Sequence, residues 1–280
     1  MAKFILKTKI TNILRGNNGK TALELKWLGT GGAFDHEERN SSVVFKVKNG
    51  KRFLVDCGST VYEDLKKKKL IEEIDYVFIT HTHDDHLSSL STVIYDRFFI
   101  HHKPIKIICL ASIQPILMVY LMDVCNHSEG QFTINEVTEE ELETDFGMKL
   151  FVVDTEGNHT PTMKTSGFVF NFKINDQELY IVYSGDINTP IINLMNDELK
   201  TKLLINPDNV FIFHDMTIFD YPGNVHTNYK LLEPLTETFK NIFVYHHNKA
   251  QSDVLKQENS MLQSVVTMDK DLIIVENLGL

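Results

Sequence analysis

The chain has 280 residues, and its hydrophobic content of 42% is sufficient for a large domain with a sizeable core. Its net charge of −10 argues against a large nucleic-acid-binding surface, because such a surface needs clustered Lys and Arg. Three widely spaced cysteines and the lack of a long apolar run argue against a disulfide-rich secreted protein or a membrane protein, and we expect a cytoplasmic protein, in the host cytoplasm if the gene is viral.

The first half of the chain predicts strands that give way to helices. A glycine-rich loop from Gly29 to Phe34 lacks the Gly-Lys-Ser/Thr ending of a phosphate-binding loop, so we expect its glycines to let the backbone approach a neighbouring segment or a site closely. Apolar residues at helical spacing after residue 86 predict a helix, and a second apolar helix covers 114–125. The expected strands are 5–10, 22–28, 43–47, 52–56, 76–79 and 105–110.

The second half alternates strands with helical patterns. A polar connection over 126–145 contains an acidic run, 136–143, that reads as a solvated helix face. A helix is expected over 227–240, with a break near Pro234. The expected strands are 149–153, 167–174, 178–183, 210–213 and 242–245. This order of strands and helices predicts an α/β fold in which two mixed sheets pack face to face with helices outside. We expect it to form a single domain over 1–280.

The densest chemical signal is the segment from His81 to His86, where three histidines and two aspartates follow an apolar strand. So many polar groups would be too costly to bury without partners. Imidazole nitrogens and carboxylate oxygens are ligands that Zn²⁺, Mn²⁺ and Fe²⁺ prefer. The segment therefore predicts a metal site.

Later strands place His or Asp at their carboxyl ends, where α/β sheets gather ligand sites. Each residue alone has an ordinary structural explanation, but together with the 81–86 segment they provide donors for two ions. Asp186 is the best candidate for a bridging carboxylate. The residues that follow these strands are His159, Asp186, His214, Asp215, His246 and His247.

The sequence Thr-His-Thr-His-Asp-Asp-His resembles the HxHxDH signature of the metallo-β-lactamase fold, an αββα sandwich. By this resemblance, one zinc ion is held by His81, His83 and His159. The second is held by Asp85, His86 and His246, and Asp186 lies between the two ions. Asp56 resembles the early aspartate of the family, which supports the ligands through hydrogen bonds. Mn²⁺ is the alternative metal, and no organic cofactor is expected.

The segments Leu28–Ala33, Arg39–Ser42 and Val55–Gly58 resemble the ribonuclease Z branch of this fold, over about residues 25–249. The resemblance implies that His226 and Asp215 assist Asp85 in catalysis, with His226 protonating the leaving oxygen. In two respects the sequence departs from that branch. Asp215 replaces a glutamate, and only 26 residues separate His159 from Asp186, too few for the arm that grips tRNA.

A phosphodiesterase core without an RNA-binding arm resembles the anti-Pycsar proteins, which degrade cyclic CMP and cyclic UMP. The resemblance implies hydrolysis of cyclic mononucleotides (cCMP, cUMP, cAMP or cGMP) by a metal-bound hydroxide, and a role in antagonising cyclic-nucleotide antiphage signalling. The alternatives are a ribonuclease Z-type tRNA 3′-end endonuclease, a hydrolase of another ester, thioester or lactam, and a non-catalytic metal-binding scaffold.

Dimeric relatives favour a homodimer, with no membrane or nucleic-acid partner. The apolar residues that form either the core or a dimer face are Ile94, Phe98, Phe99, Leu117, Tyr120 and Leu121. Three aromatic residues are candidates for stacking on a base, although packing explains each of them as well: Phe34, Tyr95 and Tyr221.

Overall fold

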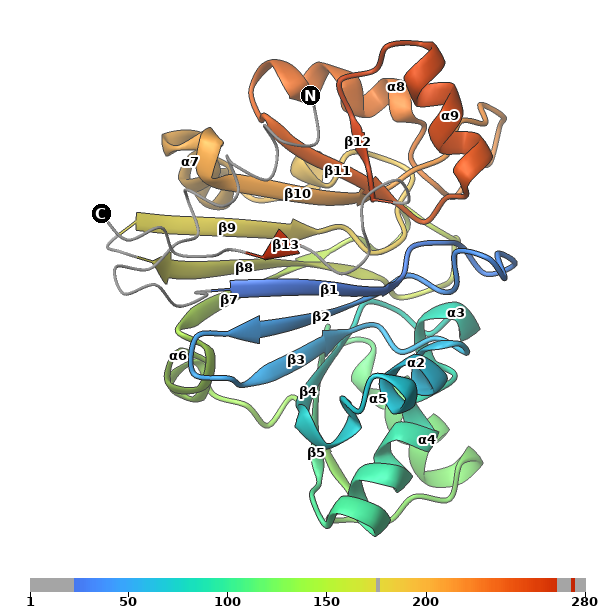
Figure 1. Ribbon diagram of the computed structural model, residues 1–280, viewed down its shortest axis with the longest axis vertical. Helices are drawn as coiled ribbons and strands as arrows, with labels where there is room; N and C mark the ends of the chain where they lie inside the picture. The colour runs from blue at the N-terminus through green and yellow to red at the C-terminus, as the bar shows by residue number, and fades with distance from the viewer. Residues whose placement is uncertain (1–22, 175–176, 266–272, 275–280) are drawn as a thin grey trace.

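A computed structural model describes residues 23–174, 177–265 and 273–274, and contains two mixed β-sheets that pack face to face (Figure 1). The first sheet has the strand order β13-β1-β2-β3-β4-β5-β6. Its strands are β1 (Leu23–Gly29), β2 (Ser42–Val47), β3 (Arg52–Val55), β4 (Ile74–Ile79), β5 (Ile105–Cys109), β6 (Phe132–Ile134) and β13 (Ile273–Ile274).

The second sheet has the order β12-β11-β10-β9-β8-β7. The pairs β7–β8 and β8–β9 are antiparallel, whereas β9, β10, β11 and β12 run parallel to one another. Its strands are β7 (Met148–Asp154), β8 (Ser166–Ile174), β9 (Gln177–Tyr183), β10 (Val210–Asp215), β11 (Asn241–Tyr245) and β12 (Gln263–Ser264).

Aromatic side chains fill the space between the two sheets. The ring of Phe170, from β8, lies 5.3 Å from that of Phe45 and 5.2 Å from that of Phe78, both of which belong to the first sheet. Trp27 of β1 reaches across in the same way to Phe213 of β10. Alternate residues of each strand point to one face, so the strand period of two brings these rings into one central layer.

Helices cover the outer face of each sheet, which gives the four layers expected from the sequence (Figure 1). The first sheet is covered by α2 (Val61–Lys67), α3 (Asp84–Leu87), α4 (Leu90–Tyr95) and α5 (Gln114–Met118). The second is covered by α7 (Asp197–Ile205), α8 (Tyr229–Leu232) and α9 (Lys249–Gln257). The αββα prediction is confirmed. The expectation of a single domain over 1–280 stays a prediction.

Two local expectations need correction. The polar connection contains the short strand β6, which a run of three residues does not signal, and then α6 (Glu139–Phe146), whose start is capped by Thr138. The helix expected over 227–240 is one α-helical turn, α8, continued by a 3₁₀ helix over Glu233–Glu237, because Pro234 cannot donate a backbone hydrogen bond. The strand expected over 5–10 lies outside the described residues.

The apolar residues expected to form either the core or a dimer face differ in burial. Ile94, Leu117 and Leu121 are fully buried, whereas Phe99 is 58% exposed. Ile94 lies in α4 and Leu117 in α5. Phe99 and Leu121 lie on the π-helical segments Asp96–Ile100 and Val119–Val124, which continue these two helices. Within the described part of the chain, no helix is long and apolar enough to cross a membrane.

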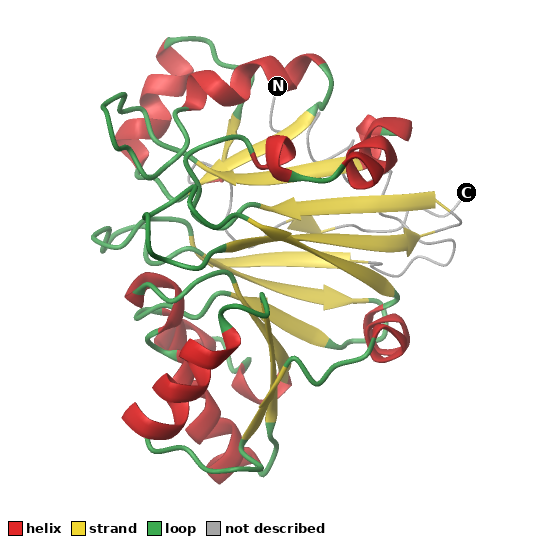
Figure 2. Cartoon of the chain, turned by 180° about the vertical axis from the view of Figure 1, so that it is seen from behind, coloured by secondary structure: helices red, strands yellow, loops and turns green. Residues whose placement is uncertain are grey.

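The loops that follow β1, β4, β7, β9, β10 and β11 gather at one end of the sandwich, which Figure 2 shows from behind. The metal ligands predicted from the sequence are expected at this end, because the carboxyl ends of parallel strands meet there.

Candidate metal centre and active-site cleft

Five strands deliver the predicted side chains to this end of the sandwich. His81 follows β4, Asp186 follows β9 and His246 follows β11. His159 lies in the loop after β7, and Asp215 is the last residue of β10. All are buried or nearly so. The structure thus brings these five residues to one end of the sandwich.

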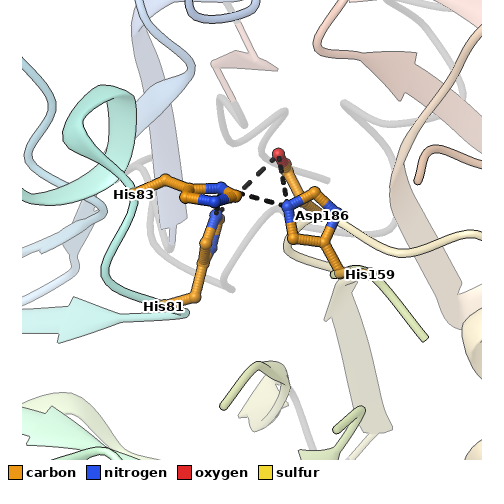
Figure 3. Close-up of side chains that lie close together, drawn as sticks. All are labelled: His81, His83, His159 and Asp186. Atoms are coloured by element: carbon orange, nitrogen blue, oxygen red, sulfur yellow. Dashed lines mark hydrogen bonds and ion pairs between the residues drawn. The ribbon is translucent and has the colours of Figure 1, made fainter. Parts of the chain in front are cut away.

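The first group joins His81, His83, His159 and Asp186, whose ligand atoms all lie within 4.8 Å of one another (Figure 3). Nδ1 of His83 lies 3.1 Å from Nε2 of His81 and 3.1 Å from Nε2 of His159. Nitrogens bound tetrahedrally to one zinc ion at 2.0–2.1 Å are about 3.3 Å apart, so this spacing fits a shared cation.

The second group joins Asp85, His86, Asp186 and His246 within the same limit of 4.8 Å. Nε2 of His246 lies 3.2 Å from Oδ2 of Asp85 and 3.3 Å from Oδ2 of Asp186. Nε2 of His86 lies 3.4 Å from the other carboxylate oxygen of Asp186, Oδ1. Each group thus offers nitrogen and oxygen donors of the kind that divalent transition metals bind.

Asp186 belongs to both groups and is almost fully buried. Its Oδ1 atom and Nε2 of His86 are buried without a hydrogen-bond partner. Buried polar atoms without partners are rare and call for an explanation. A bound cation explains both atoms, and buried His/Asp clusters of this kind are typical of a binuclear metal site.

Contacts behind the histidines fix which ring nitrogen faces the centre. Nδ1 of His86 donates to Oδ2 of Asp56 over 2.9 Å, and Nδ1 of His159 donates to the carbonyl oxygen of Val225 over 2.9 Å. The Thr80 hydroxyl donates to Asp56 and accepts from Nδ1 of His81. In each ring Nε2 is consequently left with its lone pair toward the centre, the tautomer that a metal ligand needs.

The local electrostatics favour a cation. Burial, followed by the neighbouring charge of His86, lowers the pKa of His81, which keeps this ring neutral. Burial acts in the same direction on His86, but the carboxylates of Asp186, Asp85 and Asp56 outweigh it and raise the pKa of His86. The carboxylates thus attract positive charge to the place where the unpartnered nitrogen lies.

Backbone conformation near the centre is unusual in ways that the sequence only suggests. Asp56 and His246 have positive φ angles of 59° and 63°, which non-glycine residues rarely adopt. A Cβ atom at Gly58 would lie 1.8 Å from the carbonyl oxygen of Asp85, and one at Gly32 would lie 3.0 Å from Cε1 of His246. The glycines thus permit the close approach expected of the loop from Gly29 to Phe34.

His226 and Asp215 form a pair beside the centre. Nδ1 of His226 lies 2.9 Å from Oδ2 of Asp215 and 3.9 Å from Oδ2 of Asp186. Burial opposes protonation, but the hydrogen bond to Asp215 and the charges of Asp186 and Asp215 raise the pKa of His226 to about 9. His214 is fully buried, with Nε2 accepting from the backbone N–H of Ile191, so it serves the structure.

A cleft of about 1200 Å³ opens onto these side chains. It is bordered by the loop between β1 and β2, the loop between β10 and α8, and the start of α9. Residues from both groups and His226 line its floor. Space of this size accommodates a small organic ligand in contact with the candidate metal centre.

Some assignments beside the centre change. Tyr95 lies outside the cleft, because its ring stacks on His127 and its hydroxyl donates to the carbonyl of Cys125. Sequence reasoning missed Thr80, although its place between β4 and His81 was a usable signal, and it missed Phe219, which lines the cleft. His247 points to Ser264, so His246 alone of this pair joins a ligand group.

Comparison with known sequences identifies a protein family that matches most of this chain. The family model described as "Anti-Pycsar protein Apyc1" matches residues 23–267. The Apyc1 protein of Paenibacillus harenae is 28% identical over 226 residues, which cover 77% of this chain and 86% of that protein. The Apyc1 protein of Bacillus phage 010DV004 is 35% identical over 88 residues, and the match spans 31% of this chain and about a third (34%) of the phage protein.

Comparison with solved structures identifies the fold. The metallo-β-lactamase fold protein YhfI from Bacillus subtilis superimposes with a TM-score of 0.65 at 16% identity. The superposition covers 91% of this chain and 99% of YhfI. At such low identity the likeness concerns the fold alone, and it agrees with the four-layer arrangement of sheets and helices.

Proposed function

The chain belongs to the anti-Pycsar Apyc1 family and has the metallo-β-lactamase fold, and we propose that it hydrolyses cyclic mononucleotides of the cCMP, cUMP, cAMP and cGMP class. The observation that carries the proposal is the position of Asp186, shared by two ligand groups and 3.9 Å from His226. We propose that its task is to remove the signals of cyclic-nucleotide antiphage defence, as the family name implies.

We propose that two Zn²⁺ ions bind this centre, with Mn²⁺ as the other metal to test. His81, His83 and His159 would hold one ion, Asp85, His86 and His246 the second, and Asp186 both. The fit rests on the 3.1 Å nitrogen spacings and on the unpartnered Nε2 of His86 and Oδ1 of Asp186. Such a metal pair supplies Lewis acidity and lowers the pKa of bound water.

His226 is the residue that we propose protonates the leaving ribose oxygen. Its Nδ1 is held by Asp215, which leaves Nε2 as the nitrogen able to contact a substrate in the cleft. His226 is 24% exposed at its side chain, whereas Asp215 is fully buried. Asp215 therefore positions the imidazole and stabilises its protonated form. Asp85 would orient the attacking water through its carboxylate.

Positioning of the phosphate follows from the same side chains. In-line attack requires the scissile phosphate to lie between the ligand groups and His226, with the leaving oxygen toward His226. In this arrangement proton transfer needs only one step, from Nε2 to the departing oxygen. The oxygen of the attacking water forms a new P–O bond, the P–O bond to the ribose oxygen breaks, and that oxygen takes the proton of His226, which yields a nucleoside monophosphate. The proton that the attacking water loses passes to solvent, from which His226 is protonated again.

A tRNA substrate has less support. The strands β8 and β9 follow His159 with little room for an additional arm. Acidic side chains of Asp35, Glu37 and Glu38 line the cleft, where a polyanion would be repelled. A cyclic mononucleotide carries a single negative charge and suits this cleft better than an RNA backbone.

We further propose that the chain forms a homodimer in the cytoplasm, where cyclic-nucleotide signals act. Exposed apolar side chains on consecutive helical segments support an interface, namely Phe99, Ile100, Ile116, Val119 and Val124. Light scattering coupled to size-exclusion chromatography would give the mass directly, and a mass of one chain at micromolar concentration contradicts the dimer.

The discriminating experiment incubates the metal-loaded protein with cCMP, cUMP, cAMP, cGMP and a tRNA precursor, with and without EDTA. The variant His83→Asn tests the centre, and His102→Asn, at an exposed histidine outside it, is the matched control. We expect turnover of at least one cyclic nucleotide that EDTA and His83→Asn abolish and His102→Asn preserves. Trimmed tRNA with every cyclic nucleotide intact supports the endonuclease instead.

A further inference from the structure

Three exposed aromatic side chains line the same cleft. Phe34 is 94% exposed, Phe219 is 56% exposed and Tyr221 is 53% exposed, and all three belong to the lining. Large apolar side chains scattered singly on a surface need no explanation. These three gather at the entrance to a buried polar centre, and we refer to them as the aromatic rim.

The loop that carries Phe34 is fixed relative to the second ligand group. The Thr30 carbonyl accepts from the backbone N–H of His246 over 2.8 Å, and Gly32 packs against the His246 ring. Within the loop, Oδ1 of Asp35 accepts from the backbone N–H groups of Glu37 and Glu38. The backbone that carries Phe34 is therefore anchored, although the Phe34 side chain itself is almost fully exposed.

The loop that carries the other two rings is fixed relative to His226. The Asn224 side chain donates to the carbonyl of Phe219 over 2.9 Å and accepts from the backbone N–H of His226. The backbone N–H of Asn224 in turn donates to the carbonyl of Tyr221. One asparagine thus ties both rings to the residue proposed to protonate the leaving group.

The charges near Phe34 differ from those at the candidate metal centre. Asp35, Glu37 and Glu38 lie next to Phe34 in the chain and disfavour a phosphate there, whereas the cations proposed for the centre would favour one. The uncharged part of a nucleotide is then left for the aromatic rim. Every base has a flat π-face, and stacking on an aromatic side chain is the usual way for proteins to hold one without reading its edges.

We propose that Phe34, Phe219 and Tyr221 form the base-binding subsite, an inference that rests on the proposed function. The subsite holds the base by stacking, while the phosphate lies between the ligand groups and His226. Since stacking is tolerant of sequence, this subsite accepts more than one base. The rim thereby determines the preference for a nucleotide over a phosphodiester that lacks a base.

The test compares turnover of a cyclic nucleotide with that of ribose 3′,5′-cyclic phosphate, which has no base. The variants Phe34→Leu, Phe219→Leu and Tyr221→Leu keep an apolar side chain but lose the planar ring, and Phe34→Trp retains one. Phe151→Leu is the matched control, since Phe151 lies in β7, outside the cleft and outside the proposed dimer interface.

For the three rim variants we expect kcat/KM on the cyclic nucleotide to fall by about 5- to 100-fold, mainly through a higher KM. Turnover of the base-free ester should change far less, and Phe34→Trp should restore the nucleotide preference. If all three rim variants match Phe151→Leu in the ratio of kcat/KM for the two substrates, the proposed subsite is wrong. If wild-type protein hydrolyses the base-free ester but no cyclic nucleotide, the proposed function fails and the subsite with it.

Discussion

Nδ1 of His226 lies 2.9 Å from Oδ2 of Asp215, a carboxylate with no exposed surface. Ribonuclease Z enzymes, by the resemblance noted from the sequence, have a longer glutamate at this position. The shorter side chain still reaches the imidazole because Asp215 ends β10 directly beneath the loop that carries His226. The pair places an imidazole with a pKa raised to about 9 next to the ligand groups.

Replacing His226 should reveal its role through the leaving group. We expect His226→Ala to lower kcat on a cyclic nucleotide by about 10²- to 10⁴-fold, because an alkoxide must then leave without a proton. A p-nitrophenyl phosphodiester has a leaving group that needs no proton, and its hydrolysis should fall much less. Steady-state kinetics on the two substrates measure the difference, and equal losses on both contradict the assignment.

Asp215→Asn should impair the same step indirectly. The amide cannot stabilise a protonated imidazole as a carboxylate does, so we expect kcat to fall by about 10- to 100-fold with little change in KM. Because both residues act in one step, the double variant with His226→Ala should be no slower than His226→Ala alone. Additive losses in this double-mutant cycle would indicate two independent roles.

Asp56→Asn should weaken metal binding without altering the backbone. Asp56 accepts hydrogen bonds from His86 and from Thr80, and an asparagine offers one acceptor oxygen instead of two. Asparagine tolerates the positive φ of this position, so strain is not the cause of any effect. We expect metal affinity to fall about 10- to 100-fold in chelator competition, while Asp123→Asn, at an exposed site, leaves it unchanged.

Removing the metal should destabilise the fold. The buried carboxylates of Asp85 and Asp186 lie 3.3 Å and 3.4 Å from Nε2 of His86, and Oδ1 of Asp186 is buried without a hydrogen-bond partner. At ion concentrations about a thousandfold above Kd, binding contributes about 4 kcal/mol, so EDTA should lower Tm by roughly 5–15 °C. Differential scanning calorimetry with re-addition of Zn²⁺ measures this. A Tm unaffected by EDTA, with metal analysis confirming its loss, contradicts the coupling.

Acid sensitivity should depend partly on Asp96, far from the cleft. Burial raises its pKa, but hydrogen bonds from Lys66 and Tyr62 and the nearby His101 outweigh burial and lower it. A lowered pKa stabilises the folded state above the ordinary value of 3.8, and this contribution is lost as pH falls through the folded-state pKa. We expect Asp96→Asn to be less stable than wild type at pH 7, with the difference shrinking below about pH 4 in urea unfolding. A constant difference down to pH 2 would refute this.

The seven predicted ligands were within reach of sequence reasoning for a physical reason. His81, His83, Asp85 and His86 are adjacent in sequence, and each remaining residue follows an apolar strand whose end is easily recognised. Parallel strands then require these ends to meet. The geometry agrees with that expectation, and their roles as ligands stay predictions to be tested by the experiments above.

Contacts between loops that are far apart in the sequence could not be predicted from the sequence. That Tyr95 packs on His127 while Phe219 lines the cleft depends on how helices and loops dock, which neither residue signals by spacing. The strand β6 is only three residues long, and its pairing with β5 supplies the stability that its own composition lacks. These contacts and this strand depend on tertiary packing and not on the local sequence.

The central claim is best tested by following a cyclic mononucleotide by ³¹P NMR in H₂¹⁸O with metal-loaded protein. We expect a single nucleoside monophosphate carrying one ¹⁸O atom from solvent, formed by wild type and by His102→Asn, and absent with His83→Asn. An intact cyclic nucleotide after long incubation with protein that retains its bound metal would contradict the account.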